Sequence, residues 1–125
     1  PVLGYQTNVL PAFYTDKSAF SVDYRLETPA EVAAVIAAQH DLGYQGGMLI
    51  TNPIPAAYAL DAEKISTTIN NAISEAEEKG IKGKDVTPFL LAKVVELTEG
   101  KSLESNIQLV FNNVALASQI GSELS

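Results

Sequence analysis

The spacing of apolar residues along the chain changes several times, and each change predicts a new element. Residues 2–7 have the pattern of a short strand, and Val22, Tyr24 and Leu26 alternate with polar residues at the period of a half-buried strand. Residues 48–50 form a short apolar run bounded by glycine and proline, which is typical of a strand buried on both faces of a parallel sheet. We therefore predict a sheet built from segments that are far apart in the sequence.

Between and after these strands, the apolar residues recur at the period of amphipathic helices. A first helix is expected after Thr28, because the sequence TPAE supplies an N-cap, a proline at the first helical position and Glu31 for a capping box. Gly43 is the expected end of this helix. Asp61 is the expected cap of a second helix that ends at Gly80.

Two further helices are predicted in the C-terminal part of the chain. Thr87 and Pro88 repeat the cap-and-proline pattern, and their helix is expected to run to about Gly100. Ser102 is the expected cap of the last helix. This order of elements predicts an α/β fold with mixed α/β/α layers, here a partial sheet with a helical C-terminal layer. Two or three strands make a thin sheet, so we expect other strands to complete it.

The last predicted helix carries three asparagines in the sequence SLESNIQLVFNN, residues 102–113. At about 100° per residue, Asn106 lies at the edge of an apolar stripe and Asn113 just beyond it. Asn112 points away from the stripe and is expected to be solvated. We expect the stripe to be buried; its members are Leu103, Ile107, Val110, Val114, Ala117 and Leu124.

The asparagines near this stripe have two alternative roles. Asn106 and Asn113 either satisfy backbone groups of neighbouring elements or face a pocket, where an amide pairs with a planar edge such as a nucleobase. Asn106 is the stronger candidate, because it lies in the first helical turn, where free N–H groups favour negative charge. Asn52 follows the apolar run, where open α/β sheets bind ligands, or else it is a turn residue restrained by Pro53.

Composition and charge narrow the class of protein. The hydrophobic fraction is 46% and the charged fraction 18%, values that suit a soluble globular domain. The formal net charge of −7 argues against nucleic-acid partners and anionic membrane surfaces. No apolar run approaches the roughly 20 residues of a membrane span. There is no cysteine, hence no disulfide and no thiolate zinc site, and we expect a cytoplasmic location.

Residues that carry nucleophilic or metal chemistry are sparse. His40 is the single histidine, and one histidine does not make a zinc site. Lys93 is expected to pair with Glu96 on the solvent face of its helix, and the other lysines occupy solvent-facing or loop positions. No lysine is therefore predicted to be buried enough for Schiff-base chemistry. No metal ligands are predicted in this segment.

Three blocks of the chain closely resemble the pseudouridine-5′-phosphate glycosidase family. They are GYQTNVLPAFYT (residues 4–15), GGMLITNPIP (residues 46–55) and TPFLLAKVVELTEGKSLESNIQLVFNN (residues 87–113). The resemblance implies that residues 1–125 are a single C-terminal segment of a larger glycosidase domain. It implies reversible cleavage of the C–C glycosidic bond of pseudouridine 5′-phosphate, which gives uracil and ribose 5-phosphate. The reaction would use a lysine Schiff base, with the lysine, the acid and the metal ligands upstream of this segment.

The resemblance also assigns one site residue and several partners. Asn106, in the block SNIQL, is the family position expected to contact the substrate; Asn113 and Asn52 are candidates from geometry alone. A manganese ion, the remainder of the same enzyme and a homotrimer are implied. Because the chain opens at Pro1 without methionine, we interpret it as a possible fragment that alone binds no manganese and catalyses nothing. The alternatives are a non-catalytic interaction or regulatory domain that retains the fold, or another sugar-phosphate-binding α/β protein.

Overall fold

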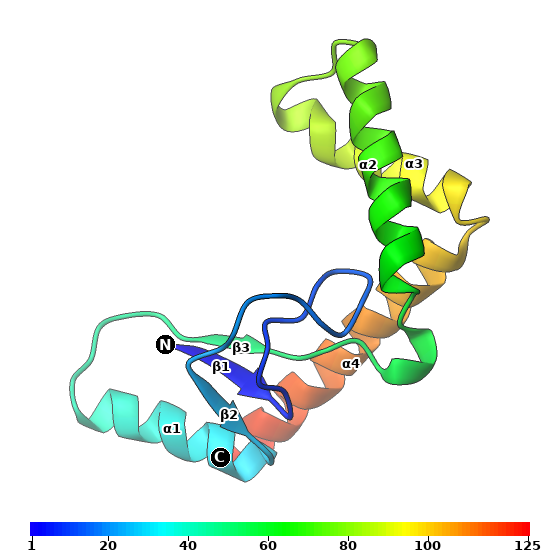
Figure 1. Cartoon of the computed structure of the whole chain (residues 1–125). Helices are drawn as coiled ribbons and strands as arrows, with labels where there is room; N and C mark the ends of the chain where they lie inside the picture. The colour runs from blue at the N-terminus through cyan, green and yellow to red at the C-terminus, as the bar shows by residue number, and fades with distance from the viewer.

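The computed structural model describes residues 1–125 and contains a sheet of three parallel strands (Figure 1). The central strand β1 (Val2–Tyr5) pairs with β2 (Tyr24–Leu26) on one side and with β3 (Leu49–Thr51) on the other. The prediction of an α/β fold with a parallel sheet is confirmed. Because all three strands run in one direction, their carboxyl ends meet at a single edge of the sheet.

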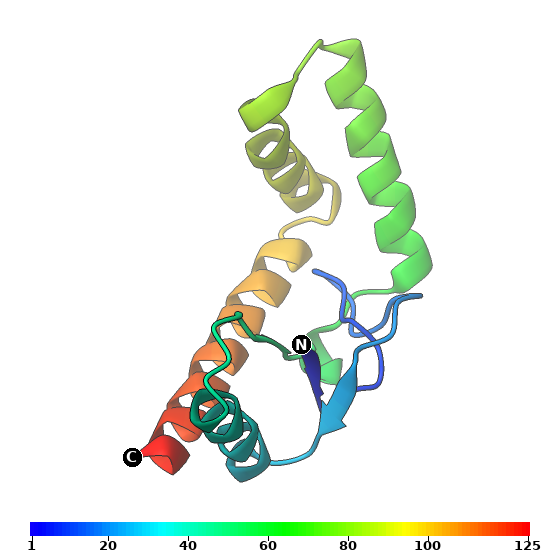
Figure 2. The same cartoon turned by 90° about the vertical axis from the view of Figure 1, so that its left-hand side faces the viewer.

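Four α-helices and two short 3₁₀ turns accompany the sheet. α1 lies beside α4 on one face of the sheet, whereas α2 and α3 form a hairpin that projects away from it (Figures 1 and 2). We call this α2–α3 hairpin the arm and the remainder the body. The elements are α1 (Pro29–Asp41), η1 (Ala56–Tyr58), α2 (Ala62–Glu78), η2 (Gly83–Asp85), α3 (Val86–Leu97) and α4 (Lys101–Leu124).

The first two helices begin and end as the sequence predicts. The Thr28 hydroxyl accepts a hydrogen bond from the Glu31 N–H at 3.2 Å, and the Glu31 carboxylate accepts one from the Thr28 N–H at 3.2 Å. This reciprocal pair is a capping box. At the start of α2, the Asp61 carboxylate accepts from a backbone N–H of the first turn. Gly43 and Gly80 follow the two helices with φ of 71° and 68°, as helix-ending glycines commonly do.

α3 and α4 begin differently from the prediction. η2 runs directly into α3, so Thr87 and Pro88 lie inside its first turn, where a proline is tolerated because its missing N–H has no intrahelical partner. α4 follows Gly100, whose φ is 84°, and Ser102 is a buried helical residue instead of the cap. The hydroxyl of Thr98 takes over part of the capping, because it accepts from the Ser102 N–H at 3.1 Å.

The chain has two separate hydrophobic cores. In the body, α1 and α4 pack on the face of the sheet that carries Tyr5, Leu26 and Ile50; the buried members are Val32, Leu116 and Ile120. In the arm, α2 and α3 enclose Tyr14, which arrives from the loop after β1; its buried partners are Ile65, Ala72 and Val94. Burial raises the pKa of the Tyr14 phenol above its ordinary value.

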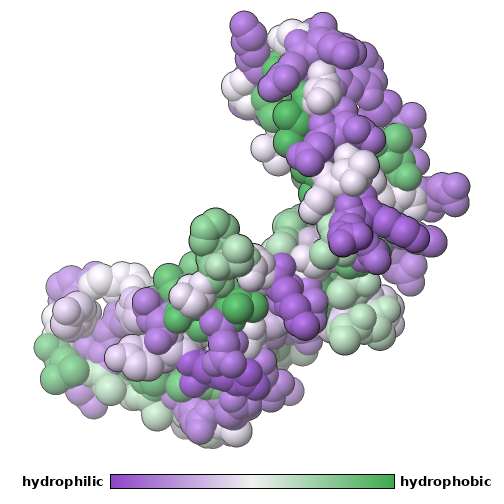
Figure 3. Space-filling model, in the orientation of Figure 1, coloured by the Kyte–Doolittle hydropathy of each residue, from purple (hydrophilic) through white to green (hydrophobic).

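The apolar stripe predicted to bury α4 lies largely in solvent, so that prediction is wrong for residues 1–125. The large stripe residues are 42–59% exposed: Leu103, Ile107, Val110, Val114 and Leu124. α4 instead packs through Leu116 and Ile120, a face about 100° around the helix from the stripe. β3 was predicted to be buried on both faces of the sheet, and this is also wrong. Leu49 is exposed on one face, and the helices cover only the other face, which carries Ile50. Apolar patches accordingly interrupt the hydrophilic surface of body and arm (Figure 3).

An ion-pair cluster joins the two helices of the arm. The ammonium of Lys93 lies 2.9 Å from one carboxylate oxygen of Glu75, and that of Lys79 lies 3.0 Å from the other. Lys93 also reaches Glu96 at 3.5 Å, as expected, but its side chain is only 19% exposed, so its predicted solvent position is wrong. Hydrogen bonds from Lys93, which has the larger effect, and from Lys79 lower the pKa of Glu75. The hydrogen bond to Glu75 in turn raises the pKa of Lys93.

This cluster predicts a loss of stability in acid. The pKa of Glu75 is lower in the folded than in the unfolded chain, so its contribution is complete above the ordinary value of 4.5 and is lost as the pH falls through the lowered folded value. We expect Glu75→Gln to unfold at a lower temperature than the wild type at neutral pH, and the difference to shrink in strong acid. Circular dichroism melts measure both effects. Glu78→Gln removes an exposed, unpaired carboxylate of the same helix and is the control; equal melting of the Glu75→Gln variant and wild type at neutral pH would contradict the prediction.

Candidate functional site

A cleft of about 370 Å³ lies where the three parallel strands end. Its polar lining comes from the segment after β1, from the long loop that follows and from β2, and the residues after β3 complete it. Open α/β sheets bind ligands at this edge, beyond the carboxyl ends of the strands. The polar lining residues are Gln6, Thr7, Asn8, Asp16, Lys17 and Arg25.

A tight reversal of the chain after β1 shapes one wall of the cleft. A Cβ atom on Gly4 would overlap the Thr7 carbonyl oxygen and lie 2.9 Å from a methyl of Val22, so only glycine fits there. Gln6 has a φ of 56°, in the left-handed region that residues other than glycine rarely adopt. The Thr7 hydroxyl closes the turn: it donates to the Val9 carbonyl at 2.9 Å and accepts from the Val9 N–H at 3.2 Å. The wall is therefore held in an unusual backbone conformation by local contacts.

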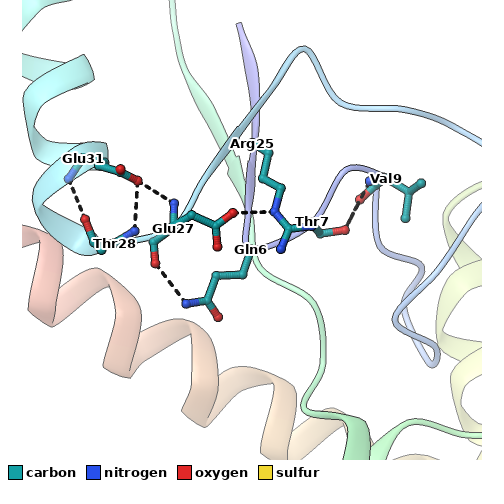
Figure 4. A network of polar contacts seen from close by, with 7 residues as sticks. All are labelled: Gln6, Thr7, Val9, Arg25, Glu27, Thr28 and Glu31. Carbon is teal, nitrogen blue, oxygen red and sulfur yellow. Dashed lines mark hydrogen bonds and ion pairs between the residues drawn. The ribbon is translucent and has the colours of Figure 1, made fainter.

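A hydrogen-bond network connects this wall to the start of α1 (Figure 4). The Gln6 side-chain amide donates to the Glu27 carbonyl at 2.9 Å, and Arg25 Nε lies 2.5 Å from a Glu27 carboxylate oxygen. The Glu31 carboxylate accepts from the N–H of Glu27 at 2.6 Å as well as from Thr28. The Arg25 guanidinium is thus held through Nε, and its terminal nitrogens have no hydrogen-bond partner in the chain.

The asparagines after β3 and in the middle of α4 bond to one another. The Asn52 amide donates to the Asn112 carbonyl at 3.3 Å and to the Asn113 side-chain oxygen at 3.2 Å. The Asn112 amide donates to the Pro53 carbonyl at 3.1 Å, so the expectation that Asn112 is solvated is wrong; it lies on the side of α4 nearer the sheet. Asn113 is exposed. The structure therefore brings Asn52 and Asn113 together, and their roles as substrate contacts stay predictions.

Asn106 lies apart from this group, near the beginning of α4. It is half-buried, and its side-chain amide has no hydrogen-bond partner in the chain. The neighbouring Ser105 is buried and donates to the Tyr58 carbonyl at 2.6 Å, which ties this part of α4 to η1. Asn106 does not line the strand-end cleft. Its assignment as a substrate contact stays a prediction.

The sequence analysis missed the cleft residues. Gln6 and Thr7 end the segment predicted as the first strand, and Lys17 lies in the irregular stretch after it. No catalytic or binding motif marks any of the three. Arg25 did have a signal, because it is the only arginine of the chain and stands one residue before the end of a predicted strand. What could not be seen from the sequence is that the chain folds back after β1 and brings these residues to one place.

The chain contains no group of three or more His, Cys, Asp or Glu residues that could hold a metal ion. Nor does any helix have the length and apolar character needed to cross a membrane.

Comparison with known sequences identifies relatives that all belong to one family. Residues 1–123 match the family described as indigoidine synthase A like protein. The pseudouridine-5′-phosphate glycosidase of Clostridium botulinum is 60% identical over 125 residues, which are all of this chain and 41% of that protein. The glycosidase of Escherichia coli is 49% identical over 123 residues, or 98% of this chain and 39% of that protein. The resemblance inferred from the sequence is confirmed, and the chain spans about two-fifths of the length of these relatives.

Solved structures share the fold. The prealnumycin C-glycosynthase AlnA, in complex with ribulose 5-phosphate, superposes with a TM-score of 0.89 at 25% identity and covers 99% of this chain and 41% of its own. An indigoidine synthase A-like protein from Thermotoga maritima superposes with a TM-score of 0.83 at 33% identity, over 96% of this chain and 39% of its own. Both agree with the α/β prediction.

Proposed function

Because the chain belongs to the indigoidine synthase A like family, we propose that it is part of an enzyme that cleaves the C–C glycosidic bond of pseudouridine 5′-phosphate reversibly, giving uracil and ribose 5-phosphate. The observation that carries this proposal is the 60% identity, along the whole chain, to a pseudouridine-5′-phosphate glycosidase. The C-glycosynthase of the same fold holds a five-carbon sugar phosphate, which supports a small sugar-phosphate substrate.

The chain is, in this proposal, a C-terminal segment of a larger domain. The apolar stripe of α4 is continuous over several turns and exposed, and one face of the sheet lacks a covering helix in this chain. Exposed apolar surfaces of this kind are commonly covered by another part of the protein. The relatives are more than twice as long as this chain, and we propose that their additional sequence covers these surfaces.

The chemistry of the proposed reaction needs groups outside residues 1–125. Lys93 is the only lysine that is not exposed, and Glu75 raises its pKa, so it stays protonated and is not a nucleophile. The Schiff-base lysine, the acid and a manganese ion belong, by resemblance, to the remainder of the enzyme. A homotrimer completes the proposal on the same basis, and a cytoplasmic location is proposed because the sequence contains no cysteine.

Asn106 is the residue of this chain that would contact the substrate. Its half-buried amide has no partner in the chain, so it is free to pair with a donor and an acceptor of the pyrimidine or the sugar. Asn52 and Asn113, which bond to each other, would hold the segment after β3 against the middle of α4, apart from Asn106. An amide positions a substrate; it does not replace the missing nucleophile.

The test is uracil release from pseudouridine 5′-phosphate by the complete protein that contains this chain. Asn106→Ala is expected to lower kcat/KM by roughly 10- to 100-fold, the effect of one lost hydrogen-bonding contact of about 1–3 kcal/mol. Asn71→Ala, at an exposed position of α2, is the control and should leave the rate unchanged.

Three further results would count against the proposal. The first is uracil release, or manganese binding, by the 125-residue chain alone, because we expect neither. The second is a complete protein without glycosidase activity, which would favour the non-catalytic interaction or regulatory domain. If thermal shifts with unrelated nucleotides equal those with ribose 5-phosphate, another sugar-phosphate-binding or nucleotide-binding role is favoured.

A further inference from the structure

The strand-end cleft presents a guanidinium whose outer face is unused. Arg25 is fixed by the contact of its Nε with Glu27, while Nη1 and Nη2 have no acceptor in the chain. The side chain is 39% exposed and lines the cleft. A guanidinium held in this way offers two parallel donors, the geometry that suits bidentate contact with a carboxylate or a phosphate.

Other unpaired donors line the same cleft. Lys17 forms no ion pair, although Asp16 is its neighbour and also lines the cleft. The backbone N–H groups of Thr7 and Asn8 donate to no acceptor in the chain, because the turn after β1 leaves them outside the sheet ladder. Successive free N–H groups in a left-handed turn favour an anion. Lys17 and Arg25 share this cleft with the carboxylate of Asp16, and the Glu27 carboxylate is paired with Arg25 Nε.

We propose that this cleft binds the phosphate group of a sugar phosphate, with the Arg25 fork as the main contact and Lys17 and the N–H groups of Thr7 and Asn8 around it. The inference rests on the proposed function and names the part of the substrate that this chain receives. The cleft volume of about 370 Å³ is in the range of small-ligand sites, so the attached pentose also has room. Glu27 is a positioning residue, because it acts on the ligand through Arg25.

The experiment is a titration of the complete ¹⁵N-labelled protein that contains this chain with ribose 5-phosphate, inorganic phosphate and ribose, followed by NMR. Ribose 5-phosphate and phosphate should shift the amide signals of Thr7 and Asn8, and ribose should not. Arg25→Gln should weaken ribose 5-phosphate binding at least about tenfold, the loss of a charge-assisted pair. Arg25→Lys keeps the positive charge but lacks the two parallel donors, so its affinity for ribose 5-phosphate should lie between those of the wild type and Arg25→Gln.

Lys84→Gln is the matched control, since it removes one positive charge from η2, in the arm and outside the cleft. Unchanged ribose 5-phosphate binding by Arg25→Gln would overturn the inference. Shifts confined to the amides around Lys84 would also overturn the inference. The absence of any shift in a protein whose spectrum shows it to be folded would do the same. These readouts do not involve turnover: a complete enzyme that releases uracil while this cleft binds no phosphate would refute the cleft assignment and leave the proposed reaction standing.

Discussion

Gly4→Ala is expected to destabilise the chain by about 3 kcal/mol or more, at the upper end of what overpacking costs. The added methyl would overlap the Thr7 carbonyl oxygen, which belongs to the backbone and cannot rotate away. It would also lie 2.9 Å from Val22. The reversal after β1 must therefore open, and this reversal carries both Gln6 in its left-handed conformation and one wall of the cleft.

Gly121→Ala is expected to have the opposite effect on stability in the same chain. Gly121 lies inside α4, and a Cβ there meets nothing within 4 Å. Alanine is favoured over glycine in a helix by up to about 1 kcal/mol, so this variant should be slightly more stable than the wild type. Urea unfolding followed by circular dichroism measures both changes. Equal stability of the two alanine variants would show that the chain after β1 is not held as tightly as the structure indicates.

Leu116→Ala is expected to cost about 2–5 kcal/mol, the range for removal of a buried leucine side chain. Leu116 is buried between α4, α1 and the sheet, where it packs with Val32 and Ile120. A cavity at this position removes contacts from α1 and α4 at once. We therefore expect the body to unfold at a clearly lower urea concentration.

Val114→Ala is the control, because Val114 is on the same helix, two residues away, and 59% exposed. In the 125-residue chain its effect should stay within about 0.5 kcal/mol. In the complete protein the same substitution should become costly, since we propose that the apolar stripe is covered there. A large effect of Val114→Ala in the 125-residue chain would mean that α4 packs through the stripe after all.

The sequence predicted those features of the fold that depend on neighbouring residues. The capping box of Thr28 and Glu31, the Asp61 cap and the glycines after the first two helices all follow from local backbone chemistry. The start of α4 was predicted less well, because Ser102 has the chemistry of a cap but is buried. The hydroxyl that takes over comes from the end of the preceding helix.

Features that depend on distant partners could not be predicted in the same way. The apolar stripe of α4 correctly marks a surface that avoids water, but periodicity does not say which partner covers it. Lys93 was expected in solvent because Glu75, on another helix, is invisible to a helical-wheel argument. Asn112 was misplaced for the same reason, since its partner Pro53 is brought near only by the fold.

The loop between β1 and β2 contacts both the core of the arm and the cleft of the body. It delivers Tyr14 to the core of the arm and, three residues later, Lys17 to the cleft of the body. The backbone N–H of Leu60, just before α2, adds a hydrogen bond to the Tyr14 carbonyl at 2.9 Å. The arm therefore anchors one wall of the cleft, because Tyr14 ties the segment that holds Lys17 to the core of α2 and α3.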